Sequence, residues 1–183
     1  MRGSNHSIMN LVTAGFAGMT GFLVLKTDSP DFIKTAVTAS KDFLIDSGSM
    51  PIYIYGAVAF LAYLLGSLLP DIDHPNSKIG RVIYLPFKHR TWTHAIWVPA
   101  VLLITGIFFR WVFWLGLGYF FHLFWDSFSA SGVDWFYPKR NKSHKLKLYH
   151  TGQASEYIVM SMSVALLVLY IVFVMQMIYH FIK

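Results

Sequence analysis

The chain has 183 residues, enough for one domain, and 55% of them are hydrophobic against only 13% charged. Soluble domains carry about 25% charged residues, so this composition indicates a chain solvated largely by lipid. The absence of cysteine excludes disulfides and thiolate metal ligands. We interpret the net charge of +6 as a membrane-topology signal, with anionic lipid or nucleic acid as alternative partners of the basic residues.

Apolar runs, taken in chain order, predict an all-α, multi-pass membrane protein that forms a single domain over residues 1–183. A helix that crosses a bilayer needs about 20 apolar residues. The longest run is interrupted at Arg110 and Trp111, so we interpret it as a helical hairpin whose short arms can be tilted, re-entrant or partly inserted. The first run lacks a clear cleavage site and is expected to stay as a helix. The predicted helices are Ile8–Leu25, Ile52–Leu69, Ala95–Phe109, Val112–Phe128 and Tyr157–Ile182.

The segments between these helices differ in charge, which predicts their side of the membrane. Residues 26–51 mix acids with lysines, and their apolar residues recur at roughly helical spacing, so we expect an outer loop with an interfacial helix. Residues 129–155 form a basic loop. With a cytoplasmic N-terminus, ten of the 15 Lys and Arg residues fall on the inner side and five on the outer side. The positive-inside rule therefore predicts that the N-terminus is cytoplasmic and the C-terminus external.

Histidine and acidic residues from distant parts of the sequence gather at one membrane face in this topology. Each lies just before or just after a predicted helix, or in its last turns, and all these positions are at the cytoplasmic ends. The sequence therefore predicts a metal site where the helices meet the cytoplasm, and no single motif is required for this prediction. The residues are His6, Asp71, Asp73, His74, His89, His94, His122, Asp126 and Glu156.

The spacing of the acidic residues and their histidine neighbours supports metal ligation. His122 and Asp126 are four residues apart and share one helix face, in an apolar stretch where both are costly unless paired or metal-bound. The alternative is a buried hydrogen bond between the two side chains. Asp71, Asp73 and His74 follow a proline that ends the helix, and close carboxylates repel unless a cation lies between them. The alternative for this second group is a solvated helix end.

The pair His89 and His94 is five residues apart, a spacing that does not place both on one helix face. We expect one in the loop and one at the helix start, with Thr91 or Thr93 as the cap. The donor set of His nitrogen and Asp oxygen suits zinc, with manganese or iron as alternatives.

Three further residues are candidates with an equally ordinary structural explanation. Arg90 has a planar fork that matches phosphate oxygens, and its alternative role is an anchor at the membrane interface. Glu156 is a candidate metal ligand or general base, or it simply favours the dipole at a helix start. His6 is a secondary ligand or a solvated terminal residue. We assign no site role to His144, His150 and His180.

Other signatures are missing from the sequence. There is no Walker-type phosphate loop, no nucleophile elbow and no zincin pattern of two histidines flanking a glutamate. The basic stretch Lys139–Lys147 lies in no recognisable nucleic-acid-binding fold. Binding to the membrane surface is the simpler account of this stretch, and we expect no direct contact with nucleic acid.

The motifs together resemble the YdjM-like family of bacterial inner-membrane proteins, from His6 to about Glu156. Thr91 and Ala95 stand where the family usually has Gly and Ser. More distantly, the chain is similar to zinc-dependent phospholipase C and zinc nucleases, which share the His-x-x-x-Asp pair, although Gly152 replaces a histidine of that group. The residues that carry the resemblance are Leu68 to Pro75 with Ser77 and Gly80, His89-Arg90, Thr93-His94, Gly118-Tyr119, His122, Asp126, Gly132-Val133, Pro138, and Gly152 with Glu156.

The resemblance implies a metal-dependent hydrolase of the bacterial inner membrane and also a protein that binds LexA. We therefore expect hydrolysis of a phosphate ester or phosphodiester, with a membrane lipid as substrate, at a centre of one to three ions. Two alternatives stay open: a non-enzymatic membrane protein that binds a regulator through its basic loops, and a metal-ion or proton transporter. The expected ligands are Asp71, Asp73, His74, His94, His122 and Asp126, with His89 and His6 as secondary ligands and with Arg90, Glu156 and Asp73 in catalytic roles.

Overall fold

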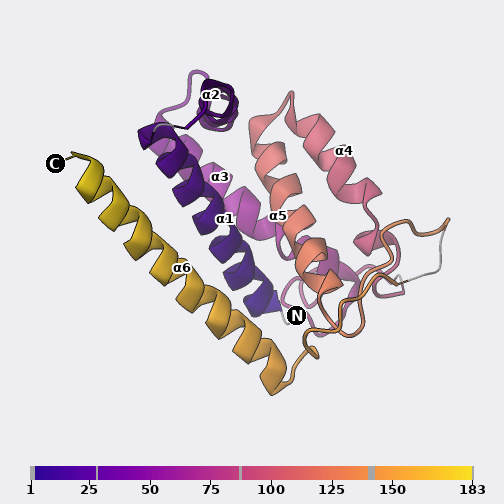
Figure 1. Ribbon diagram of the computed structural model, residues 1–183. Helices are drawn as coiled ribbons and strands as arrows, with labels where there is room; N and C mark the ends of the chain where they lie inside the picture. Colours follow the sequence, from indigo (N-terminus) through magenta and orange to yellow (C-terminus); the bar gives the residue numbers. More distant parts are fainter. Residues whose placement is uncertain (1–2, 28, 87, 140–142, 183) are drawn as a thin grey trace.

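The computed structural model shown in Figure 1 describes residues 3–27, 29–86, 88–139 and 143–182, with side chains described from 5 to 179 within these ranges. Arg140 and Lys142 of the basic loop and the side chain of His180 lie outside the described residues. The described chain is helical and contains no strand, which confirms the predicted all-α class. Its elements are α1 (Gly3–Lys26), α2 (Asp31–Ile45), α3 (Ile52–Gly66), η1 (Leu69–Asp73), η2 (Trp92–His94), α4 (Trp97–Gly106), α5 (Arg110–Ser127) and α6 (Ala154–Ile182), where η marks a short 3₁₀ helix.

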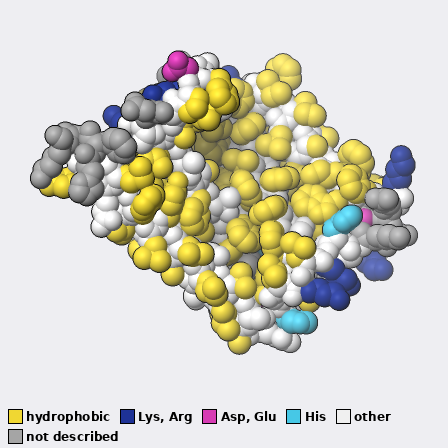
Figure 2. Space-filling view, viewed as in Figure 1, with side chains coloured by type: hydrophobic (Ala, Val, Ile, Leu, Met, Phe, Trp, Pro, Cys, Tyr) yellow, Lys and Arg dark blue, Asp and Glu magenta, His cyan; other side chains and the backbone are white. Residues whose placement is uncertain are grey.

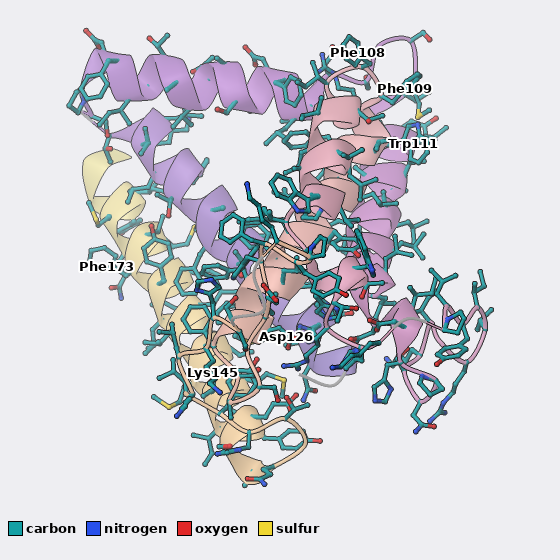
Figure 3. All side chains as sticks on the ribbon, turned by 90° about the vertical axis from the view of Figure 1, so that its right-hand side faces the viewer. Phe108, Phe109, Trp111, Asp126, Lys145 and Phe173 are labelled. Atoms are coloured by element: carbon teal, nitrogen blue, oxygen red, sulfur yellow. The ribbon has the colours of Figure 1, made fainter. Side chains whose placement is uncertain are left out.

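The helices α1, α3, α4, α5 and α6 lie side by side, and α2 lies across one end of them (Figures 1 and 3). The start of α1 and the end of α6 are at opposite ends of this arrangement (Figure 1). Phe108, Phe109 and Trp111 lie at the α2 end, whereas Asp126 and Lys145 lie toward the other end (Figure 3). One face is largely apolar, and its charged side chains are gathered toward its ends (Figure 2).

Among the described residues, two helices are long and apolar enough to cross a membrane by length and composition, fewer than the five predicted. They are the stretches Asn5–Lys26 and Ala154–Tyr179. The predicted arm Ala95–Phe109 forms an α-helix only over the 10 residues of α4, which span about 15 Å against a bilayer core of about 30 Å. The amphipathic segment after α1 does form a helix, α2, and none of its residues is buried.

The end of α3 turns two aspartates into the protein. The predicted helix Ile52–Leu69 stops at Gly66, and the chain tightens into η1, which has Pro70 in its first turn. Proline lacks an N–H and cannot continue an α-helix. As a result Asp71 and Asp73 leave the helix axis and become buried.

Glycines let α3 and α5 approach each other closely, and this close approach determines where His122 of α5 lies relative to α3. A Cβ atom built on Gly118 would lie 2.1 Å from the carbonyl oxygen of Tyr63, and one built on Gly66 would lie 2.0 Å from the carbonyl oxygen of Leu115. Small residues of this kind allow direct backbone contact between helices in membrane proteins. His122 lies one turn after Gly118, so this contact fixes its position against η1.

We expect Gly118→Ala to lower the free energy of unfolding by about 1–3 kcal/mol, because the added methyl group overlaps the α3 backbone. Gly56→Ala is the matched control, because a Cβ there meets nothing within 4 Å, and alanine is about 1 kcal/mol better than glycine in a helix. Thermal unfolding of both variants in detergent measures the difference. Equal melting temperatures would contradict the close contact.

A buried histidine and aspartate cluster

Side chains from four elements meet at the end of the helices opposite α2. The cluster contains His6 from α1, Asp71 and Asp73 from η1, His94 from η2, and His122 with Asp126 from α5. All six are buried, and the three histidine side chains and Asp126 are at most 1% exposed. Figure 3 places Asp126 in the crowded lower part of the bundle. These six residues, predicted from distant stretches of the sequence, are brought together by the structure.

The proton on the His122 ring is fixed by a backbone carbonyl. Nδ1 of His122 lies 2.7 Å from the carbonyl oxygen of Ser67, which can only accept a hydrogen bond. Nδ1 therefore carries the proton, and Nε2 of the neutral ring presents a lone pair. This Nε2 atom is buried and has no hydrogen-bond partner.

The proton on the His94 ring is fixed in the same way through Thr93. The Thr93 hydroxyl donates its one proton to Oδ2 of Asp73 at 2.5 Å, so its oxygen accepts a hydrogen bond from Nδ1 of His94 at 2.9 Å. Nε2 of His94 consequently presents a lone pair as well, and it too is buried without a hydrogen-bond partner. The hydroxyl of Tyr119 donates to the backbone carbonyl of Thr93 and helps to hold this turn in place.

Both of these lone pairs face carboxylates. Nε2 of His122 lies 3.6 Å from Oδ1 of Asp71 and 3.8 Å from Oδ2 of Asp126. Nε2 of His94 lies 3.9 Å from the same Asp71 oxygen and 3.6 Å from the same Asp126 oxygen. Two ligands held about 2.1 Å from one tetrahedral ion are roughly 3.4 Å apart, so these separations suit shared coordination of a metal better than direct hydrogen bonds.

His6 extends the cluster to the first helix. Its ring stacks on that of His122 with centroids 3.6 Å apart, and its Nε2 lies 3.2 Å from Oδ1 of Asp126. Neither ring nitrogen of His6 has a hydrogen-bond partner. Potential ligand atoms of His6, His122 and Asp126 lie within 4.8 Å of one another, the spacing expected of residues that hold one metal ion.

A second group of potential ligands adjoins the first and contains Asp71, His89 and His94. Nδ1 of His89 donates to Oδ1 of Asp73 at 2.7 Å, which leaves its Nε2 available to a metal. Carboxylate oxygens commonly orient metal-binding histidines in this manner. His74 lies at the edge, with its ring 5.0 Å from that of His89, and is in neither group among the described residues.

Three ionisable groups of the cluster outside the long helices, Asp71, Asp73 and His94, have shifted pKa values that favour the protonation states needed for metal ligation. Burial disfavours the charged form of Asp71, but the contact of this carboxylate with the His122 side chain outweighs burial and holds the pKa of Asp71 below its usual range. Burial acts similarly on Asp73, and hydrogen bonds from His89 and Thr93 lower its pKa. Burial lowers the pKa of His94, which favours the neutral imidazole. Two ionised carboxylates and a neutral ring are therefore expected at neutral pH.

Arg90 binds protein groups at the rim of the cluster. Its Nη2 lies 3.1 Å from Oδ2 of Asp126, and its Nη1 donates to the Ser129 hydroxyl at 3.2 Å and to the Gly132 carbonyl at 2.9 Å. Its own backbone adopts a left-handed φ of 64°, and its amide donates to Asp73. The predicted phosphate-binding fork thus ties an aspartate of the cluster to the segment after α5.

Glu156 joins the start of α6 to the start of α1. Its carboxylate accepts hydrogen bonds from Nδ2 of Asn5 at 2.6 Å and from the amide of Gly152 at 2.5 Å, and its side chain is fully buried. It is in neither of the two potential metal-binding groups. Of the histidines expected to lie outside the site, His144 pairs through its backbone with Val133, and His150 is exposed.

Residues that orient the ligands were missed by sequence reasoning. Ser67 acts through its backbone carbonyl, which leaves no trace in the identity of the side chain. Thr93 was expected only as a possible helix cap, but its hydroxyl links Asp73 to His94. The signal for Thr93 was its position directly before a candidate ligand.

Comparison with known proteins identifies relatives of this chain. The sequence model of the YdjM inner membrane protein family matches residues 35–181, a stretch that contains every cluster residue except His6. The uncharacterized protein YvsG of Bacillus subtilis (strain 168) is 32% identical over 109 residues, which cover 53% of this chain and 68% of that protein. No solved structure matches.

We expect Arg90→Lys to lower the free energy of unfolding by about 1.5–3 kcal/mol, because a lysine cannot contact Asp126, Ser129 and Gly132 together. Arg81→Lys, at an exposed position, is the control. The measurement is the thermal midpoint of each variant in detergent. If the two substitutions shift the midpoint equally, Arg90 does not hold the rim together.

Proposed function

Because this chain belongs to the YdjM inner membrane protein family, we propose that its buried cluster is the metal centre of a membrane-embedded, metal-dependent hydrolase. One observation carries the proposal. The buried Nε2 atoms of His94 and His122 face the carboxylates of Asp71 and Asp126, and these two nitrogen atoms have no hydrogen-bond partner. Buried polar atoms without partners cost about 1–3 kcal/mol each, and a cation between these groups removes that cost.

The donor set supports zinc, and manganese or iron are compatible with it. His6, His122 and Asp126 would hold one ion, and Asp71, His89 and His94 a second. A bound divalent ion supplies Lewis-acid activation of water and neutralises charge on phosphoryl oxygens. Ser67, Thr93 and Asp73 keep the ligand nitrogens deprotonated and directed inward, and Arg90 steadies Asp126.

A phosphate ester or phosphodiester is the proposed substrate class. Hydrolysis adds water to phosphorus, breaks the P–O ester bond, and passes a proton to the departing oxygen. The side chains of His89 and Arg90 are 33% and 17% exposed, so the cluster opens to substrate on their side. The exposed basic residues Lys78, Arg81 and Lys88, in the segment that leads to His89, favour an anionic substrate. A lipid fits best, since membership of a membrane family supports an opening that lies near lipid headgroups.

We propose a multi-pass topology in which the cluster lies at the cytoplasmic face and α2 lies at the outer face. The alternating directions of α1, α3, the α4–α5 hairpin and α6 support five passages with the N-terminus inside (Figure 1). Described basic residues are also more numerous at the cluster end than at the α2 end.

An alkaline phosphatase fusion tests this topology. A fusion at the C-terminus is expected to be active in the periplasm, and one placed after His150 is expected to be inactive. Activity of the second fusion, or of neither, would refute the proposed orientation.

The metal centre is tested by elemental analysis of protein purified in mild detergent. We expect metal in the unaltered protein and at least a tenfold loss in His122→Ala and in Asp73→Ala, together with loss of lipid phosphatase or phospholipase activity. His150→Ala, which removes an exposed histidine outside the cluster, is the control. Full metal content in both cluster variants would refute the centre. Metal content without hydrolysis of any lipid or soluble phosphate ester would refute only the hydrolase.

A further inference from the structure

The segment between η1 and η2 forms the rim of the cluster and exposes a run of large apolar residues. We call residues 75–86 the mouth loop. Val82 is 79% exposed, Ile83 57%, Tyr84 48% and Leu85 37%. Four consecutive exposed apolar residues in a loop are unusual on a surface that faces only water. Lys78, Arg81 and the following Lys88 are also exposed, and no acidic residue occurs between Asp73 and Lys88.

The mouth loop is held in a defined shape, so this exposure is built into the fold. Its base is closed by the amide of Leu85, which donates to the carbonyl of Ile72 at 3.1 Å. The Ser77 hydroxyl donates to the carbonyl of Asp71 at 2.7 Å and accepts from the amide of Gly80 at 2.8 Å. A Cβ on Gly80 would lie 2.1 Å from the carbonyl oxygen of His74, so the tight turn requires glycine.

The mouth loop lies at the cluster end of the helices, which the proposed topology puts at the cytoplasmic surface of the bilayer. The loop follows the end of α3 and precedes the start of α4, on the side away from α2. Exposed apolar side chains at this level lie beside lipid acyl chains, and the neighbouring basic residues lie beside headgroups. Because no acid offsets these basic residues, a leaflet that contains anionic phospholipid is the partner their charge fits.

We propose that the mouth loop inserts Val82 to Leu85 into the cytoplasmic leaflet and gathers anionic phospholipid at the opening of the cluster. Both ends of the loop carry cluster residues, with Asp71 and Asp73 before it and His89 and His94 after it. A headgroup bound by Lys78, Arg81 and Lys88 is thus held beside the ligands. The inference deepens the proposed hydrolase and rests on it for the substrate class, an anionic glycerophospholipid, but the insertion of the loop is testable alone.

Insertion can be measured by site-directed labelling, because the chain has no cysteine. Val82→Cys and Ile83→Cys are labelled with a nitroxide in nanodiscs that contain phosphatidylglycerol, and the accessibility of each label to oxygen and to a water-soluble nickel chelate is compared. Asn76→Cys, an exposed polar position in the same loop, is the control. We expect the labels at 82 and 83 to be more accessible to oxygen than to the chelate, and the label at 76 to be more accessible to the chelate. Equal access of the chelate to all three would overturn insertion.

The charge of the mouth loop is tested with Lys78→Gln, Arg81→Gln and Lys88→Gln combined. We expect the amount of phosphatidylglycerol retained over phosphatidylcholine, measured by native mass spectrometry, to fall by up to roughly fivefold for each charge removed. Lys145→Gln with Lys147→Gln, in the other basic loop, is the control. Equal retention in the two variants would overturn the lipid assignment.

These two experiments separate the mouth loop from the hydrolase. If the loop inserts but the protein hydrolyses no phosphate ester, the membrane insertion is supported and the proposed hydrolase activity is refuted. If the protein hydrolyses soluble phosphate esters but the labels at 82 and 83 stay in water, the proposed metal centre is supported and the insertion of the mouth loop is refuted.

Discussion

Imidazole lone pairs face carboxylates in a buried site that water does not reach. The rest of the structure follows from this one constraint. The tautomers of neutral His94 and His122 are set by Thr93 and by the Ser67 carbonyl, and in this neutral form neither ring can donate from Nε2 to the nearby oxygens of Asp71 and Asp126. The contact of Gly118 with α3 brings His122 to this position. A bound cation would reconcile these groups, because it would be coordinated by the lone pairs and by the carboxylates together.

The same centre would add a link between α1, through His6, and the elements α5, η1 and η2. Polar bonds link α1 to α3 and α5: Asn10 donates to the carbonyl of Gly118 at 2.9 Å, Tyr63 donates to the carbonyl of Asn10 at 2.7 Å, and Trp125 donates to Thr13 at 3.0 Å. Lipid supplies little hydrophobic force between helices, so such bonds and metal ligation carry more of the association. Metal binding is therefore expected to be coupled to helix packing.

The sequence predicted much of this arrangement because spacing and hydropathy are local properties. The apolar runs located α1, α3, α5 and α6, and polar residues beside them located the cluster. Helix lengths were less predictable: Pro70 marked a break, but the earlier stop at Gly66 depends on packing against α5. Hydrogen-bond partners were not predictable either. Arg90 and Glu156 have side chains suited to substrates or metals, yet the structure gives both of them protein partners that only the tertiary fold brings close.

The most direct test is diffraction from crystals of the purified protein, with data collected on both sides of the absorption edge of the metal that it carries. The account predicts an anomalous peak about 2.0–2.1 Å from Nε2 of His122 and within bonding distance of an Asp126 oxygen. An ordered cluster without any anomalous peak, in which the carboxylates instead accept hydrogen bonds from protonated Nε2 atoms of His94 and His122, would contradict it.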